Sequence, residues 1–243
     1  MSKVILVTGG NAGIGLSLVR LLAEKDHIVY IGSRNEASGK QAEEQLITEG
    51  LKTVKSVQLD VTQISSIEAA KEKIEKAEGK LDVLVNNAGI SRMDSSQIAT
   101  SVEIPVMRDT METNFFGLVQ TTIAFLPLLR KSSQGVILNV SMGMASNTFM
   151  ARPENSALHR FVAYNTSKTA MNSYTIALAY ELKNEGIKVN AVCPGFVSTK
   201  LNYYAPGGKT TKEGAEILLP YALLDKDGVT GKFIDGSGNE SPW

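Results

Sequence analysis

A short apolar run that leads into a cluster of glycines most constrains what this chain can fold into. Residues 3–8 are rich in Val and Ile, which is typical of a buried strand, and residues 13–25 carry apolar side chains at helical spacing. Gly9, Gly13 and Gly15 between them follow a G-x-x-x-G-x-G spacing. Such glycines let the backbone approach a pyrophosphate, and the helix presents free N–H groups to that anion. The pattern favours a dinucleotide-binding turn over a plain strand-to-helix connection.

Apolar runs alternate with amphipathic runs along the rest of the chain. The later strands are predicted at residues 27–32, 55–59, 81–86, 135–140, 187–192 and 231–234. The later helices are predicted at residues 36–49, 64–77, 111–129 (interrupted or bent near Pro127), 163–183 and 211–224. This order predicts an α/β fold: one Rossmann-type domain over residues 1–243, with a doubly wound parallel sheet and helices on both faces. Irregular stretches at 91–104, 142–161 and 196–210 follow strands, so we expect them to surround the substrate.

Composition excludes several kinds of protein. Lys plus Arg and Asp plus Glu are both 25, and this zero formal charge argues against a nucleic-acid partner. Cys193 is the only cysteine, so the chain has no internal disulfide, and no Cys/His cluster has metal-ligand spacing. Apolar stretches break well short of the roughly 18 residues of a membrane span, and the N-terminus leads straight into the glycine turn. We therefore expect a cytoplasmic protein with no metal and no membrane partner.

The end of the second predicted strand indicates which dinucleotide binds. An acidic residue there would accept a hydrogen bond from the ribose 2′-OH of NAD, whereas an arginine can hold the 2′-phosphate of NADP. This chain has Ser33 and Arg34, and no acid before Glu36. A hydroxyl and a guanidinium suit a phosphate, which favours NADP(H) over NAD(H).

Tyr164 and Lys168 are spaced i and i+4 in a predicted helix, so both project from one face. A nearby ammonium would stabilise phenolate and lower the tyrosine pKa from about 10 toward working pH. Tyrosine then becomes a usable general acid or base. Taken alone, the spacing fits a surface helix pair equally well.

Four further polar residues or groups hold positions where they could line a site. Ser141 follows the fifth strand, and the run 86–89 (Asn-Asn-Ala-Gly) follows the fourth. Asn114 lies in an apolar helix, where a buried amide must find partners, and Asp60 follows the third strand. Each also has a plain structural explanation, as a strand end, a turn, a buried hydrogen bond or a cap.

In their joint order these motifs resemble the short-chain dehydrogenase/reductase family. The resemblance runs from about residue 3 to at least Thr199, most of the chain. The matching motifs are the turn 8–15, Asp60-Val61, residues 86–89, Asn114, Ser141, residues 164–168, and Pro194-Gly195 with Thr199.

The resemblance implies roles for these residues. Tyr164 would protonate a carbonyl oxygen as hydride reaches the carbon, and Lys168 would bind the nicotinamide ribose and lower the tyrosine pKa. Ser141 would orient and polarise the carbonyl, and Asn114 would hold a water that links Lys168 to solvent. Asp60 would bind adenine. The expected cofactor-binding residues are Gly9, Asn11, Gly13, Ile14, Gly15, Ser33, Arg34, Asp60, Val61, Asn87, Ala88, Gly89, Tyr164, Lys168, Pro194, Gly195, Val197 and Thr199.

Within the family the chain looks most like carbonyl-reductase-type members, in Gly10-Asn11, in the stretch 208–215 and in the last residues, 241–243. It departs from the common pattern at Ala12, where NADP-preferring members often carry Lys or Arg, and at Met142, which replaces a second serine. The segment 142–163 is longer than in many members. We interpret it as a substrate-side insertion that also bears on assembly, so monomer and homo-oligomer both stay open.

These features favour NADPH-dependent reduction of a hydrophobic ketone, aldehyde or related carbonyl, or the reverse alcohol oxidation. The alternatives are an NAD-dependent alcohol dehydrogenase, a reductase of an imine or activated double bond, and a catalytically silent dinucleotide sensor. Two residues near the expected site have simpler explanations. His159 is predicted to be a solvated loop residue, and Cys193 a small packing residue.

Overall fold

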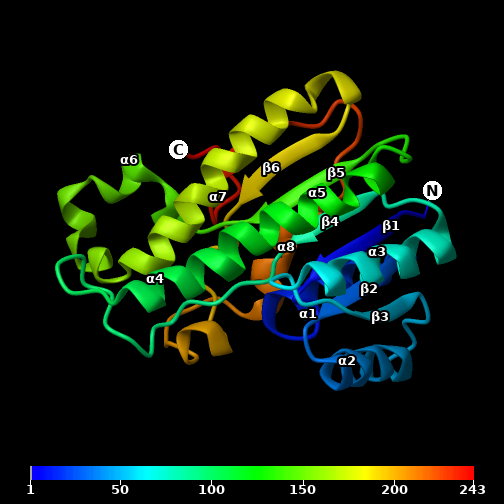
Figure 1. Ribbon diagram of the computed structural model, residues 1–243, viewed down its shortest axis with the longest axis horizontal. Helices are drawn as coiled ribbons and strands as arrows, with labels where there is room; N and C mark the ends of the chain where they lie inside the picture. The colour runs from blue at the N-terminus through cyan, green and yellow to red at the C-terminus, as the bar shows by residue number, and fades with distance from the viewer. Residues whose placement is uncertain (1) are drawn as a thin grey trace.

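In the computed structural model, residues 2–243 form one α/β domain around a seven-stranded parallel sheet (Figure 1). The strand order is β3-β2-β1-β4-β5-β6-β7. The strands are β1 (Val4–Thr8), β2 (Ile28–Ser33), β3 (Val54–Gln58), β4 (Val83–Asn86), β5 (Val136–Val140), β6 (Lys188–Val192) and β7 (Phe233–Ile234). β1 pairs with both β2 and β4, so the strand order reverses there, and a ligand crevice is expected at this point beyond the carboxyl ends of the strands. This confirms the predicted fold; Met1, the first residue of the predicted domain, lies outside the described residues.

Helices cover both faces of the sheet (Figure 1). One face packs against α1 (Gly13–Ala23), α2 (Glu36–Thr48) and α8 (Thr211–Ala222). The opposite face packs against α3 (Ile64–Glu78), α5 (Gly117–Leu129) and α7 (Val162–Glu181). Alternate residues of β1 contribute to the two cores, Ile5 and Val7 to the first and Val4 and Leu6 to the second. A strand buried on both faces explains why the sequence reads as a continuous apolar run.

The helix before β5 differs from its prediction. The expected helix 111–129 begins earlier, as α4 (Ile104–Met111), and continues through a π-helical turn, η1 (Glu112–Phe116), into α5. Pro105 lies in the first turn of α4, where its missing N–H costs nothing. Pro127 lies inside α5, which still runs to Leu129.

The segment 142–161, predicted to be irregular, contains three short helices. These are η2 (Gly143–Ala145), α6 (Asn147–Met150) and η3 (Pro153–Arg160). Each is short, so a helical period does not show in the sequence, and local signals mark two of them instead. The Ser146 side chain accepts a hydrogen bond from the Phe149 N–H, and Pro153 begins η3.

Three loops meet beyond the carboxyl ends of β4, β5 and β6. Gln97 forms a β-bridge with Phe161, which joins the β4 loop to the end of the β5 loop. The Ser91 Oγ donates to the Leu201 carbonyl at 2.6 Å, which joins the β4 loop to the β6 loop and its short helix η5 (Lys200–Asn202). Another short helix, η4 (Lys183–Glu185), follows α7 at the opposite end of the sheet.

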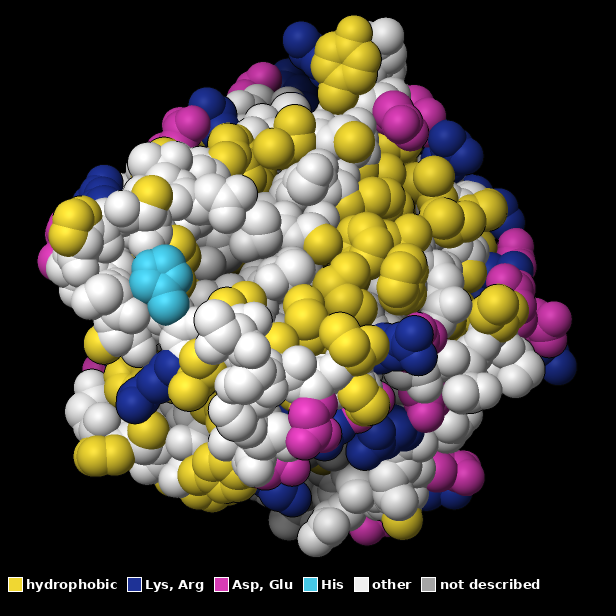
Figure 2. All heavy atoms as spheres, turned by 60° about the vertical axis from the view of Figure 1, so that its left-hand side comes forward, with side chains coloured by type: hydrophobic (Ala, Val, Ile, Leu, Met, Phe, Trp, Pro, Cys, Tyr) yellow, Lys and Arg dark blue, Asp and Glu magenta, His cyan; other side chains and the backbone are white. Residues whose placement is uncertain are grey.

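Hydrophobic side chains gather into a broad patch on one face of the molecule (Figure 2). The large exposed apolar side chains of the helices α4 to α7 are Ile104, Phe116, Ile123, Ile176 and Tyr180. Tyr180 is 82% exposed, so the segment 142–161 does not cover it in the single chain. No helix in the described part of the chain combines the length and apolarity that a membrane crossing requires.

Candidate active site

The glycine turn between β1 and α1 forms a cradle that excludes side chains. Gly9 and Gly13 have φ of +63° and +56°, a left-handed conformation that favours glycine. A Cβ on Gly15 would lie 2.4 Å from the Gly9 carbonyl oxygen. Ala12 precedes α1 and offers no side-chain cap, so the first N–H groups of the helix stay available to an anion. These features fit the pyrophosphate of a dinucleotide.

The β4 loop is hydrogen-bonded to this turn. The Thr8 Oγ1 accepts from the backbone N–H groups of Asn87 and Ala88, both at 3.0 Å. The Asn87 Nδ2 donates to the carbonyls of Thr8 and Gly9 at 2.9 and 3.1 Å. The predicted residues Asn87 and Ala88 therefore lie directly against the glycine turn. The sequence alone gave Thr8 no role of its own, although its hydroxyl at the end of β1 joins the two strands.

At the end of β2 the two predicted phosphate ligands differ in exposure. Arg34 follows β2 directly and is exposed. Ser33 is 1% exposed, and its hydroxyl donates to the Asn35 carbonyl at 2.8 Å beneath α2. Of this pair, the arginine is the side chain that the fold presents outward.

Asp60 and Val61 lie just beyond the end of β3. The Asp60 Oδ1 accepts from both the backbone N–H and the hydroxyl of Thr62, at 3.0 and 2.7 Å. Asp60 thus caps the turn before α3 with one carboxylate oxygen. Val61 is buried and packs in the core face that α3 and α5 cover.

Tyr164, Lys168 and Asn172 follow one another at intervals of four residues, on one face of α7. All three are buried, at 8%, 4% and 3% exposure. The Lys168 Nζ donates to the Val140 carbonyl, the last residue of β5, at 2.9 Å. The Ser141 Oγ donates to the Asn172 Oδ1 at 2.8 Å. The face of α7 is therefore attached to the end of β5, where Ser141 begins the loop.

Burial is the main cause of the pKa shifts of Tyr164 and Lys168. It lowers the pKa of Lys168 to about 8 and raises the pKa of Tyr164, with a smaller upward effect of the Cys193 thiol on both. The sequence-based expectation was that Lys168 lowers the pKa of Tyr164. In the structure the pKa of the phenol is instead raised, first by desolvation, because both groups lie in a low-dielectric interior that favours their neutral forms.

Asn114 lies within the π-helical turn η1, 1% exposed. Its Oδ1 accepts from the Ile90 N–H and its Nδ2 donates to the Ile90 carbonyl, both at 2.8 Å. The same Nδ2 donates to the Ser167 Oγ at 2.9 Å. A Cβ on Gly89 would lie 3.1 Å from the Asn114 Oδ1 and 3.7 Å from the Lys168 Nζ. The amide thus joins the β4 loop to α7 close to the lysine, and π-helical turns frequently mark functional sites.

The β6 loop closes over the glycine turn. A Cβ on Gly13 would lie 3.8 Å from the Thr199 Cγ2, so these distant residues are neighbours. Gly195 has a φ of +84°, and Val197 is buried. Thr199 caps η5, and Tyr203 and Tyr204 after it both have positive φ, at 54° and 55°. The fold therefore brings the predicted β6-loop residues to the same edge as the glycine turn.

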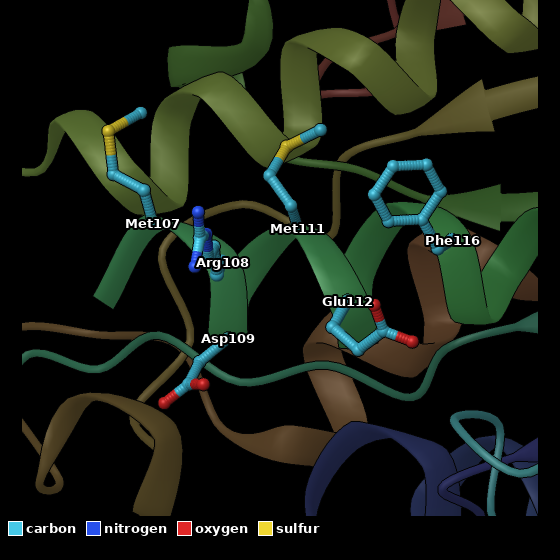
Figure 3. A pocket seen from close by; sticks show the side chains of 6 residues that line it. All are labelled: Met107, Arg108, Asp109, Met111, Glu112 and Phe116. Atoms are coloured by element: carbon cyan, nitrogen blue, oxygen red, sulfur yellow. The ribbon is translucent and has the colours of Figure 1, made fainter. Parts of the chain in front are cut away.

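A separate depression of about 410 Å³ lies outside this crevice (Figure 3). Its lining comes from α4 and η1: Met107, Arg108, Asp109, Met111, Glu112 and Phe116. None of these is a predicted site residue. His159, on η3, is exposed, and Cys193 is buried next to Phe233. Among residues 2–243, no three His, Cys, Asp or Glu side chains cluster in a way that could hold a metal.

Sequence reasoning missed two residues at this edge. Asn172 is the partner of Ser141, and its i+4 spacing from Lys168 was the available signal. Gln97 is 2% exposed and contacts the first turn of α7 from a loop, which no local pattern indicates.

A glycine cradle where the strand order reverses and a buried Tyr-Lys pair on α7 are the features expected of a dinucleotide-dependent oxidoreductase. Comparison with known proteins agrees: the family model for short chain dehydrogenases matches residues 3–207. The chain belongs to the short-chain dehydrogenase/reductase family. As a member it is an NAD(P)-binding oxidoreductase of carbonyl and alcohol substrates.

Individual relatives match over nearly the full chain. The (+)-neomenthol dehydrogenase of Capsicum annuum is 30% identical, over 96% of this chain and 95% of its own. The human carbonyl reductase [NADPH] 1 is 33% identical, over 95% of both chains. Among solved structures, NADPH-bound carbonyl reductase from chicken fatty liver superposes with a TM-score of 0.87 at 26% identity, covering 100% of this chain and 99% of its own.

Proposed function

We propose that this chain uses NADPH to reduce a hydrophobic ketone, aldehyde or related carbonyl, with Tyr164 as the proton donor. The observation that carries the proposal is the single face of α7 on which Tyr164 and Lys168 lie, attached to the end of β5 through the Lys168–Val140 hydrogen bond. The proposed acid and cation on this face, together with the Ser141 hydroxyl that follows β5, support the proposal.

Each of the site residues has a separate role in the proposed reaction. NADPH, when bound, supplies a hydride to the carbonyl carbon. Ser141 orients the carbonyl oxygen and donates a hydrogen bond to it, and Tyr164 donates the proton that the developing alkoxide takes up. Lys168, with its pKa lowered to about 8, supplies positive charge that stabilises the resulting phenolate and binds the ribose. Asn114 holds the β4 loop against α7 so that this geometry persists.

The preference for NADPH rests on Arg34. It is exposed at the end of β2, at the crevice edge, and no acidic residue precedes Glu36. A guanidinium there would pair with the 2′-phosphate. The NADPH-bound carbonyl reductase structure, similar over the whole chain, supports the same choice. Ala12 is the feature that favours the NAD-dependent alternative.

The hydrophobic substrate is inferred from the loops 91–104, 142–161 and 196–210. Their apolar and aromatic side chains suit an apolar ligand. They include Met93, Met144, Phe149, Met150, Phe161, Phe196, Leu201, Tyr203 and Tyr204. Imines and activated double bonds would accept a hydride in the same geometry, so they stand as alternative acceptors.

The test is to follow NADPH absorbance against a panel of ketones, aldehydes, enones and imines, with wild type and Tyr164→Phe. We expect turnover of at least one hydrophobic carbonyl, and a loss of about 10²–10⁴-fold in kcat in the variant with NADPH binding retained. Undiminished turnover in Tyr164→Phe would refute the assigned acid. Cofactor binding without turnover of any compound would favour the dinucleotide sensor.

A further inference from the structure

The helix that carries Tyr164 does not cap its own N-terminus. Phe161 precedes α7 and supplies no side-chain hydrogen bond to its first turn. Gln97, in the β4 loop, supplies two hydrogen-bond acceptors to this turn instead, one from its backbone and one from its side chain. Its backbone carbonyl accepts from the Val162 N–H at 3.1 Å, and its side-chain Oε1 accepts from the Tyr164 N–H at 3.0 Å. A helix begins with N–H groups that lack partners, so a residue from another loop completes this one.

The Gln97 side chain is itself held in place. It is 2% exposed, and its Nε2 donates to the carbonyls of Ser91 and Arg92 at 2.7 and 2.8 Å. Both amide protons and the amide oxygen therefore have partners. Arg92 has a φ of +49°, an uncommon conformation for a residue other than glycine, and one of the two hydrogen bonds fixes its carbonyl. A side chain with all its groups engaged has little freedom to rotate.

The same loop contacts the β6 loop on the other side of the crevice. The Ser91 Oγ donates to the Leu201 carbonyl at 2.6 Å, while the Ser91 carbonyl accepts from Gln97. A continuous series of hydrogen bonds thus runs from Leu201 through Ser91 and Gln97 to the backbone of Tyr164. One end of this series is the β6 loop, which carries the exposed Tyr203 and Tyr204. The other end is Tyr164, the proposed proton donor.

We propose that Gln97 is a positioning residue that sets the place and proton affinity of Tyr164, and that Ser91 connects it to the β6 loop. The proposal rests on the proposed function, since it concerns the residue that donates the proton. We expect the absence of charge on the Gln97 amide, as well as its hydrogen bond to the Tyr164 N–H, to affect the proton affinity of Tyr164. A carboxylate at this position would keep an acceptor for the Tyr164 N–H, lose both hydrogen bonds to the carbonyls of Ser91 and Arg92, and place a negative charge at the first turn of α7.

The experiment compares Gln97→Ala and Gln97→Glu with the matched control Asn190→Ala. Asn190 is an equally buried amide, 1% exposed, that accepts from the Lys232 N–H and donates to the Val229 carbonyl, away from α7. For each variant one measures kcat, KM, NADPH affinity, the pH profile of kcat/KM and the melting temperature. Ser91→Ala, measured in the same way, tests the connection to the β6 loop.

We expect Gln97→Ala to lose about 10–10²-fold in kcat, because a small misplacement of a reacting group is that costly. NADPH affinity should stay near the wild-type value. In Gln97→Glu the alkaline decline of kcat/KM should move to higher pH, because the added negative charge raises the pKa of Lys168, about 8 in the wild type, as well as that of the phenol. Asn190→Ala should lower the melting temperature comparably yet leave kcat and the pH profile as in wild type. Ser91→Ala should raise KM more than it lowers kcat.

Equal kcat in Gln97→Ala and Asn190→Ala would overturn the proposal, as would an unshifted pH profile in Gln97→Glu. If Gln97→Ala does not fold, the Gln97→Glu profile decides alone. The proposed function has its own control: Tyr164→Phe without activity, together with unaffected Gln97 variants, would leave the function standing and refute only this inference.

Discussion

The Ser141 hydroxyl donates its single proton to the Asn172 Oδ1, 2.8 Å away, at the end of β5. In this arrangement the serine oxygen offers only lone pairs to a substrate, so the hydroxyl must rotate before it can donate to a carbonyl oxygen. Asn172 is fixed in turn by the contact of its Nδ2 with the Ala145 carbonyl at 3.5 Å. The amide therefore sets the resting orientation of the serine.

This relationship gives the first prediction. Ser141→Ala should reduce kcat by about 10²–10³-fold, the usual cost of removing a donor to a developing oxyanion. Asn172→Ala should reduce it by only about 10-fold, since the hydroxyl remains and can still turn toward the substrate. Steady-state kinetics of both variants with one carbonyl substrate checks this. Equal losses would mean that Asn172 acts on the substrate by more than orienting the serine.

Burial of Lys168 gives a prediction about stability. Its pKa falls from the ordinary 10.5 to about 8 in the folded chain, so between these values the unfolded chain binds more protons than the folded one. The unfavourable contribution is complete below the folded pKa and disappears as the pH rises toward 10.5. Lys168→Met should therefore gain stability relative to wild type, and this gain should shrink by about 2 kcal/mol between about pH 7 and about pH 9.5.

Urea unfolding of both proteins at the two pH values measures the difference. Lys52→Met, which removes an exposed lysine, serves as the control and should follow the wild-type pH dependence. A gain in Lys168→Met that does not change with pH would contradict the depressed pKa.

Cofactor preference gives the third prediction. Arg34→Asp should weaken NADPH binding by about 10–10²-fold, the cost of losing a charge-assisted hydrogen bond, and should strengthen NADH binding. Lys52→Asp makes the same change of charge just before β3, at the amino end of that strand and not at the carboxyl ends, and should leave both affinities unchanged. Fluorescence titration with the two cofactors distinguishes the variants. An unchanged NADPH affinity in Arg34→Asp would favour the NAD-dependent reading.

Close packing at the glycine turn gives the fourth prediction. In Gly15→Ala the new methyl group would meet the Gly9 carbonyl at 2.4 Å and the Asn87 Nδ2 at 2.5 Å. We expect a loss of about 1–3 kcal/mol in the free energy of unfolding, as for other overpacked sites, together with weakened cofactor binding. Gly143→Ala, where an added Cβ has no neighbour within 4 Å, should change stability by less than about 0.5 kcal/mol. Similar losses in both variants would show that the turn adapts.

The sequence by itself determined the order of strands and helices, the glycine turn and the helical face shared by Tyr164 and Lys168. These are local properties: a buried parallel strand is apolar at every position, and residues four apart in a helix share a face. The short helices within 142–161 and the early start of α4 at Ile104 escaped prediction because caps and prolines, not periodicity, specify them.

Only the tertiary structure decided which polar groups meet. The Ser141–Asn172 pair, the attachment of Asn114 to Ile90 and the capping of α7 by Gln97 each join segments that are distant in sequence. It also decided that Ser33 lies beneath α2 while Arg34 is exposed, and that burial raises the pKa of Tyr164. The reason is physical: hydrogen-bond partners and desolvation depend on what surrounds a group in space, which packing of the whole sheet and its helices creates.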